Sequence, residues 1–104
     1  MTRRVHFEDE ADVEYRHAGA WYESRREGLG LEFFDAVDAT IRQALDFPLI
    51  GAAVSRVPLD LPVRRLAVRR FPYHVVYLET TDELRILAVA HDKRRPGYWK
   101  KRVP

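Results

Sequence analysis

An apolar run near the C-terminal end of the chain, residues 84–90, constrains the fold more than any other stretch. It reads L-R-I-L-A-V-A, and Arg85 is its one charged residue. A strand with one solvent-exposed face alternates polar and apolar residues, whereas a strand that is covered on both faces is apolar almost throughout. We therefore expect residues 84–90 to form a strand that is buried on both faces.

The polarity changes abruptly after this run. A basic stretch follows, then a Pro-Gly pair, then two aromatic residues: His91, Asp92, Lys93, Arg94, Arg95, Pro96, Gly97, Tyr98 and Trp99. The buried strand thus delivers a basic segment with an aromatic tip to one edge of a sheet. Binding residues are often presented in this way, on a loop that a rigid element positions.

Two helices are predicted in the first half of the chain. Acidic residues at positions 8–12 suit the start of a helix, because the first turn exposes unpaired N–H groups. Apolar residues then recur at helical spacing, and this first helix is expected to end near Gly28, a residue that readily adopts a left-handed C-cap. A second helix is expected from Leu29 until Pro48 stops it. The short link predicts an antiparallel helical hairpin.

The remaining segments read as strands and one loop. Residues 4–7 form a short strand candidate that must join the sheet, residues 49–62 read as an irregular loop, and three strands follow at 63–70, 73–79 and 83–91. The short connections between these three require antiparallel hairpins. The order β-α-α-β-β-β predicts an α+β fold with the helical hairpin on one sheet face. At 104 residues, the chain is expected to be a single domain over residues 1–104.

The net charge of +2 conceals a strong asymmetry between the two halves. Residues 1–47 hold six basic and eleven acidic residues, whereas residues 48–104 hold twelve basic and five acidic residues. Of the 18 basic residues 15 are arginine, which suits bidentate pairing with carboxylate or phosphate. The basic half indicates an acidic protein segment or a nucleic-acid phosphate as a partner.

Several classes of protein are disfavoured. The chain has no cysteine, so neither a disulfide framework nor a thiolate metal site is expected. It has no Gly-rich phosphate loop, and its four histidines are too dispersed to suggest a metal site, so no cofactor is predicted. No apolar run approaches the length that spans a bilayer, and the start lacks a signal-peptide pattern. We therefore expect a cytoplasmic protein without membrane contact.

Four arginines lie within seven residues of the strand predicted at 63–70. Strand alternation places Arg65 and Arg69 on one face, and if the helices cover the other face, these two would form a basic surface with Arg94 and Arg95 near one end. That surface would engage negative charge on a partner. The alternative is an edge strand that uses charge to prevent aggregation.

The cluster around His91 has a second interpretation. Cleavage of RNA by its 2′-hydroxyl needs a general base, a cation on the phosphate and a general acid, and histidine, arginine and tyrosine supply these without a metal. Aromatic rings would help to hold a base. Alternatively, Tyr98 and Trp99 simply close the edge of the core.

Four stretches occur in a particular order along the chain. They are V-H-F-E-D-E-A at 5–11, W-Y-E-S-R-R-E-G-L-G-L-E-F-F at 21–34, R-R-F-P-Y-H-V-V-Y at 69–77 and A-V-A-H-D-K-R-R-P-G-Y-W-K-K-R at 88–102. Together they resemble the RelE/ParE superfamily of toxins, the plasmid stabilisation toxins of bacterial type II toxin–antitoxin pairs. The resemblance is weakest at residues 50–62. It implies a RelE/ParE-like α+β fold with a mostly antiparallel sheet.

The resemblance also implies a function. The branch that cleaves mRNA on the ribosome typically has an arginine where His74 stands here, and a second just past the last strand, around His91 and Asp92. Tyr98 alone matches that branch comfortably. The departures favour the ParE-like branch, whose members are thought to poison DNA gyrase without cleaving nucleic acid. The chain is then a toxin that a cognate antitoxin neutralises.

Two alternatives stay open. The chain would otherwise be a ribosome-dependent, metal-independent mRNA endonuclease, with His91, Arg70 and Tyr98 as its catalytic residues, or an inactive family member that acts as a binding module. The residues predicted to bind the antitoxin or the target are Arg65, Arg69, Arg94, Arg95, Trp99 and Arg102.

Overall fold

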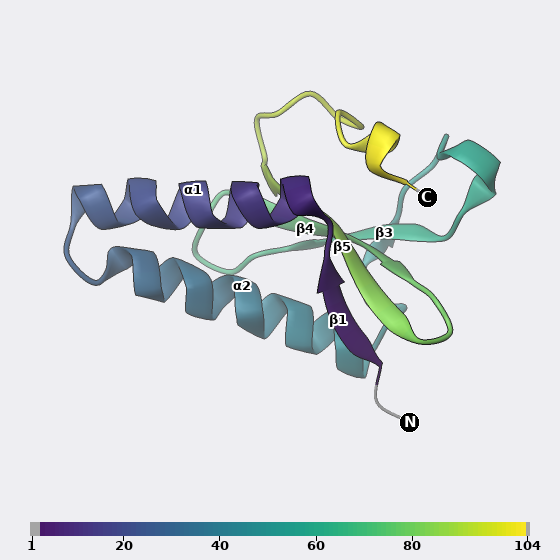
Figure 1. Ribbon diagram of the computed structural model, residues 1–104, viewed down its shortest axis with the longest axis horizontal. Helices are drawn as coiled ribbons and strands as arrows, with labels where there is room; N and C mark the ends of the chain where they lie inside the picture. The colour runs from purple at the N-terminus through teal and green to yellow at the C-terminus, as the bar shows by residue number, and fades with distance from the viewer. Residues whose placement is uncertain (1–2, 104) are drawn as a thin grey trace.

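The computed structural model describes residues 3–103 and contains a helical hairpin packed on a five-stranded sheet (Figure 1). The helices are α1, Asp9–Arg25, and α2, Leu29–Asp46. The strands are β1, Arg4–Phe7; β2, Ala52–Ala53; β3, Val63–Ala67; β4, Tyr73–Glu79; and β5, Glu83–His91. Two short 3-10 helices, Pro58–Asp60 and Lys100–Arg102, lie in the connections. The predicted α+β fold is confirmed.

The sheet is mixed, with strand order β1-β5-β4-β3-β2. β1 runs parallel to β5, with Val5 opposite Leu84, and all other neighbours are antiparallel. The expectation that the short first strand joins the sheet is therefore confirmed. β5 lies between β1 and β4 as an interior strand, which explains the apolar run that it carries.

The helices begin and end close to the predicted positions, with one difference at their junction. α1 ends at Arg25 rather than near Gly28, and Gly28 instead precedes α2 with a left-handed φ of 87°. The Glu23 carboxylate accepts hydrogen bonds from the backbone N–H groups of Gly28 and Gly30, at 3.0 Å each to the nearer oxygen. The Glu23 side chain of α1 therefore stabilises the turn between the two helices.

Two strand predictions need correction. The loop predicted at residues 49–62 contains the two-residue strand β2, which pairs with β3, and a 3-10 turn. The strand predicted at 63–70 ends at Ala67, because the chain turns back into β4 through Arg70, whose φ is 72°. Arg69 and Arg70 thus lie in a turn, where strand alternation no longer decides which face they occupy.

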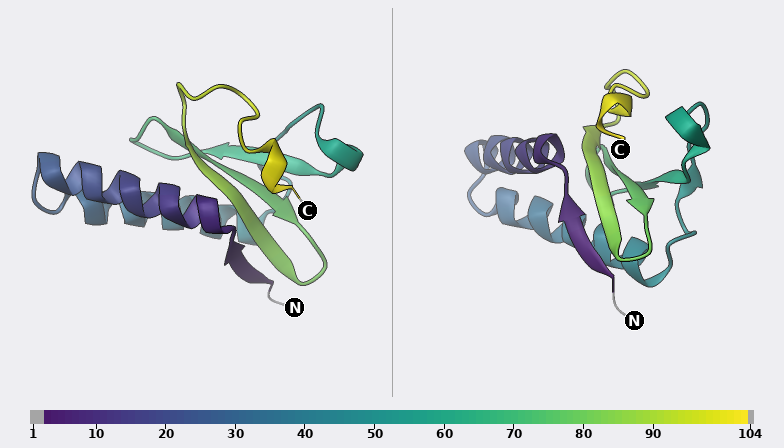
Figure 2. Two further views of the ribbon diagram at one scale, coloured as in Figure 1. Left: turned by 45° about the horizontal axis from the view of Figure 1, so that its top comes forward. Right: turned by 45° about the vertical axis from the view of Figure 1, so that its right-hand side comes forward.

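Both faces of the sheet are covered. The helices bury one face over a core that includes Phe33, Val37, Val75, Tyr77 and Ile86. On the opposite face, a second core forms where the C-terminal segment and residues 54–61 fold over the sheet: Val57, Val63, Val76, Leu87, Ala88 and Trp99. Figure 2 shows this second covering layer, with the C-terminal segment in yellow. The prediction that residues 84–90 are buried on both faces is confirmed.

A bulge in β5 helps to bury both faces. Val76 lies opposite Ala88 and Tyr77 opposite Ile86, so Leu87 has no partner in β4. The extra residue brings Leu87 and Ala88 into the same core, because a bulge interrupts the alternation of side chains along a strand.

Within residues 3–103, no helix has both the length and the apolar composition for crossing a membrane.

Candidate functional site

The segment that follows β5, residues 92–103, crosses the sheet face opposite the helices. Trp99 anchors it: its side chain is 3% exposed and packs in the second core. Trp99 is therefore a core residue, as one of the two interpretations of the sequence expected, although it was also predicted to bind a partner. Its burial holds the flanking basic residues close to the sheet.

Glu14 of α1 ties the same segment to β5. Its carboxylate accepts hydrogen bonds from the Tyr98 hydroxyl at 2.6 Å, from two Arg102 nitrogens at 2.9 and 3.0 Å, and from the Val89 backbone N–H at 3.1 Å. Arg102 also donates to the Leu87 carbonyl at 3.0 Å. Since β1 pairs with β5 only as far as Ile86, Glu14 and Arg102 complete the edge of β5 beyond the end of β1.

These contacts determine what Tyr98 and Arg102 can do. Burial raises the pKa of the Tyr98 hydroxyl, and the hydrogen bond to the Glu14 carboxylate raises it further. Burial is the largest single effect on the pKa of Arg102 and would lower it. The hydrogen bond to Glu14 and the nearby negative charges, chiefly that of Glu14, together outweigh burial and leave the pKa raised. Arg102, which was predicted to bind a partner, is thus committed to an internal ion pair.

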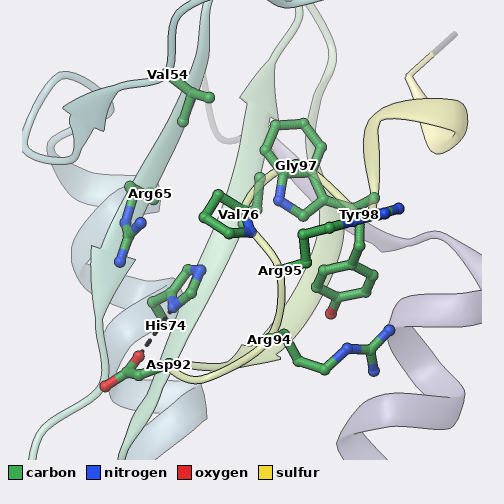
Figure 3. A pocket seen from close by; sticks show the side chains of 11 residues that line it. Val54, Arg65, His74, Val76, Asp92, Arg94, Arg95, Gly97 and Tyr98 are labelled. Atoms are coloured by element: carbon green, nitrogen blue, oxygen red, sulfur yellow. Dashed lines mark hydrogen bonds and ion pairs between the residues drawn. The ribbon is translucent and has the colours of Figure 1, made fainter.

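A small pocket opens beside this segment, on the sheet face opposite the helices (Figure 3). We call it the arginine pocket; its polar lining comprises Arg65 of β3, His74 of β4, and Asp92, Arg94 and Arg95 of the segment after β5. Its volume is about 80 Å³, and Val76 and Trp99 form part of its apolar wall. Within residues 3–103, no carboxylate forms an ion pair with Arg65, Arg94 or Arg95.

A second hollow lies on the other side of the C-terminal segment. This α1 groove, of about 280 Å³, is lined by Val13, His17, Trp21, Tyr73, His91, Arg94 and Tyr98, among others. Val13 and Trp21 are large apolar residues that remain about half exposed, at 49% and 52%. The Arg94 guanidinium lies 3.8 Å from the centre of the Tyr98 ring, and both residues line the arginine pocket as well. The two hollows therefore share Arg94 and Tyr98 as lining residues.

The structure separates the predicted binding arginines into two groups. Arg65, Arg94 and Arg95 line the arginine pocket. Arg69 instead lines a groove against α2, together with Arg70 and Glu32. The predicted basic surface therefore lacks Arg69, because β3 ends before it.

The three residues predicted to be catalytic in an endonuclease are also divided. His91 and Tyr98 both line the α1 groove, whereas Arg70 pairs with Glu32 at 3.0 Å at the groove against α2. Arg70 and Arg26 together lower the pKa of Glu32 through hydrogen bonds, with Arg26 having the larger effect. Their catalytic role stays a prediction.

Two important residues were missing from the predicted set. Asp92 lies 3.0 Å from Nδ1 of His74, a histidine that is 8% exposed. Glu14 lies on α1 beside an apolar stripe and reads there as an ordinary surface acid. The pairing of the last two strands could have indicated Asp92. With His74 opposite Ala90 in the strand register, Asp92, which follows β5 directly, lies close to His74. Among the residues described, no group of three or more His, Cys, Asp or Glu side chains is arranged to hold a metal ion.

A family profile described as "ParE toxin of type II toxin-antitoxin system, parDE" matches residues 5–96. The chain belongs to the ParE toxin family. The resemblance to RelE/ParE toxins inferred from the four sequence stretches is thereby confirmed. None of the curated proteins compared with this ParE-family chain matches it.

The fold agrees with this family. A solved structure described as "Chromosomal ParDE TA system from P. aeruginosa" superposes with a TM-score of 0.67 and 18% sequence identity. The match covers 86% of this ParE-family chain and 96% of the other chain. At this identity the match shows a shared fold, with two helices on a mixed five-stranded sheet.

Proposed function

We propose that this ParE-family toxin arrests growth by binding DNA gyrase, and that a cognate antitoxin neutralises it through an acidic, amphipathic segment. The observation that carries the proposal is the arrangement of Arg65, Arg94 and Arg95, which two separate stretches of backbone, β3 and the segment after β5, bring to one pocket. Within residues 3–103, none of the three forms an ion pair with a carboxylate. Guanidinium groups presented in this way suit an external carboxylate, which they bind in a bidentate manner.

The α1 groove supports an amphipathic antitoxin segment. Val13 and Trp21 offer apolar surface along one side of α1, and the Arg25 guanidinium lies 4.5 Å from the centre of the Trp21 ring. Arg94 supplies positive charge at the other side of the groove. A helix with one apolar stripe and flanking acids would match this surface, and folding on the toxin would let a short segment cover it.

Expression of the chain alone should arrest growth, and co-expression of a small open reading frame found upstream or downstream of its gene should relieve the arrest. The purified toxin should inhibit DNA supercoiling by gyrase.

The double variant Arg94→Glu/Arg95→Glu should weaken antitoxin binding by about tenfold or more, because it removes two ion pairs of up to about 1 kcal/mol each and adds repulsion. Arg42→Glu, an exposed arginine on α2, is the matched control and should leave binding unchanged.

The outcomes separate the candidate functions. New mRNA 5′ ends in induced cells, with normal supercoiling, would replace the gyrase proposal with a ribosome-dependent endonuclease. The hydroxyl of Tyr98 already donates to Glu14 and Arg70 is paired with Glu32, and both observations favour the gyrase-binding function. Unchanged growth combined with retained antitoxin binding would identify an inactive binding module.

A further inference from the structure

The arginine pocket holds a histidine whose orientation is determined by an aspartate. His74 is almost fully buried on β4, and its Nδ1 lies 3.0 Å from Oδ1 of Asp92. No fully buried side-chain nitrogen or oxygen among residues 3–103 lacks a hydrogen-bond partner, and Nε2 of His74 has none, so Nε2 must be accessible from the pocket. Figure 3 shows this second ring nitrogen turned away from Asp92.

Arg65 faces the same hollow. Arg65 lies opposite Val76 in the sheet register, and His74 is two residues from Val76 on the same face. Such diagonal neighbours are within reach of long side chains. In Figure 3 the Arg65 guanidinium is turned toward the pair formed by His74 and Asp92, whereas Arg94 extends to the other side, beside the Tyr98 ring. Arg65 and Nε2 of His74 are therefore the two groups that converge on the pocket.

The size of the pocket limits its occupant. About 80 Å³ is several times the roughly 10–15 Å³ that one water requires, and it is far below the roughly 300–1,000 Å³ of pockets that enclose small molecules. The occupant is thus a single functional group on a larger partner. A phosphodiester is flanked by two sugars within its chain, whereas a carboxylate stands at the free end of a side chain. The geometry favours the carboxylate.

We propose that the pocket formed by Arg65, His74 and Asp92 accepts one Asp or Glu side chain of the antitoxin, and that this docking takes up a proton on His74. The proposal rests on the proposed function for the identity of the partner. The carboxylate binds the Arg65 guanidinium and the Nε2–H of His74 together. It is the anchoring acid of the segment that lies in the adjacent α1 groove.

Proton uptake follows from the charges around the imidazole. The charged groups that line the pocket are Arg65 from β3 and Asp92, Arg94 and Arg95 from the segment after β5; the helices lie on the other face of the sheet. In the neutral ring, Nδ1–H donates to Asp92, and Nε2 then presents a lone pair to an arriving carboxylate. Protonation converts Nε2 into a donor and balances the charge of Asp92. Binding must therefore weaken as the pH rises.

Nuclear magnetic resonance of the purified full chain tests the pocket directly, with sodium acetate as the probe and sodium chloride at equal ionic strength as the reference. Acetate should shift the ring signals of His74 saturably. Its affinity should fall as the pH is raised, because binding takes up a proton. Arg65→Gln should weaken acetate binding by about tenfold or more, because a charged hydrogen bond is lost.

Two variants serve as comparisons. Arg69→Gln, which changes an arginine outside the pocket, should leave the acetate affinity unchanged. In His74→Gln the amide pairs with Asp92 but does not titrate, so any remaining binding should no longer depend on pH. This second variant keeps the test decisive if Arg65→Gln proves poorly folded.

The results would overturn the proposal in distinct ways. No saturable shift with acetate would exclude the pocket as a carboxylate site, and tighter binding of dimethyl phosphate would assign it to nucleic-acid phosphate. If acetate binds but Arg65→Gln leaves the antitoxin affinity unchanged, the occupant is not the antitoxin. A chain that binds acetate but never arrests growth would refute the proposed function and leave the carboxylate site intact.

Discussion

Glu14 shows how much one side chain contributes to the site. Its carboxylate accepts hydrogen bonds from two elements that pack beside α1. Val89 donates from β5, and Tyr98 and Arg102 donate from the C-terminal segment. The side chains of Glu14 and Arg102 are 16% and 13% exposed, so their ion pair is largely removed from solvent. Loss of one partner would leave a buried charge uncompensated, which is costly in a low-dielectric environment.

Glu14→Ala should lower the free energy of unfolding by about 3 kcal/mol, because Arg102 would remain buried without its partner. Urea denaturation of the variant and the parent chain measures this. Glu27→Ala, at an exposed position in the turn between the helices, is the control and should change stability by less than about 0.5 kcal/mol. Equal stability of Glu14→Ala and the parent would show that the network contributes nothing to folding.

The helical hairpin depends on a close approach of its two backbones. A Cβ added at Gly30 of α2 would lie 2.6 Å from the backbone oxygen of Gly19 in α1. At Gly19, an added Cβ would collide with the ring of Phe34. Glycine is therefore required at both positions for space, even though it is a poor helix former.

Gly30→Ala should destabilise the chain by about 1–3 kcal/mol, because the backbone oxygen of Gly19 has to move away from the new methyl group. Thermal and urea denaturation report the change. Ala20→Ser, which adds one atom at an exposed position of α1, should be nearly neutral. A gain of stability in Gly30→Ala, which helix propensity alone would predict, would contradict the close packing.

The molecule as a whole is a three-layer arrangement, in which the helices and the C-terminal segment cover opposite faces of one sheet. All five tyrosines are involved in this packing to some degree, and burial raises the pKa of each of them: Tyr15, Tyr22, Tyr73, Tyr77 and Tyr98. For Tyr15, a hydrogen bond to Asp38 adds to the effect of burial. Ionisation of these hydroxyls is therefore linked to unfolding.

Stability should decrease above about pH 10, where tyrosines of the unfolded chain ionise while those of the folded chain stay protonated. The unfolded state then binds fewer protons than the folded state, so the free energy of unfolding falls as the pH rises. Ultraviolet absorbance should show the phenolates appearing together with unfolding. Gradual titration at the ordinary pH in the folded chain, as in a chain unfolded by guanidinium, would refute this linkage.

Periodicity was sufficient to predict most of the elements. The spacing of apolar residues in α1 and α2, and the unbroken run in β5, each follow from burial on one helix stripe or on two strand faces, so the helices and four of the five strands could be located in advance. β2 could not, because two alanines carry no pattern. β3 was predicted to be too long, because the left-handed turn at Arg70 has no glycine to mark it.

The sequence alone determined that a buried strand is followed by a basic segment, because the apolar run and the basic residues are contiguous along the chain. The pocket itself arose from the register of two hairpins, which sets Arg65 diagonally across from His74 and brings Asp92, directly after β5, to that histidine. It was completed by the return of the chain over the sheet, where Trp99 packs beside Val57 and Val76. Long-range contacts of this kind are set by how whole elements pack. For that reason the sequence does not distinguish Glu14 from other acidic residues on the helix surface. Its role depends on the packing of α1 against β5, because its partners are far away along the chain.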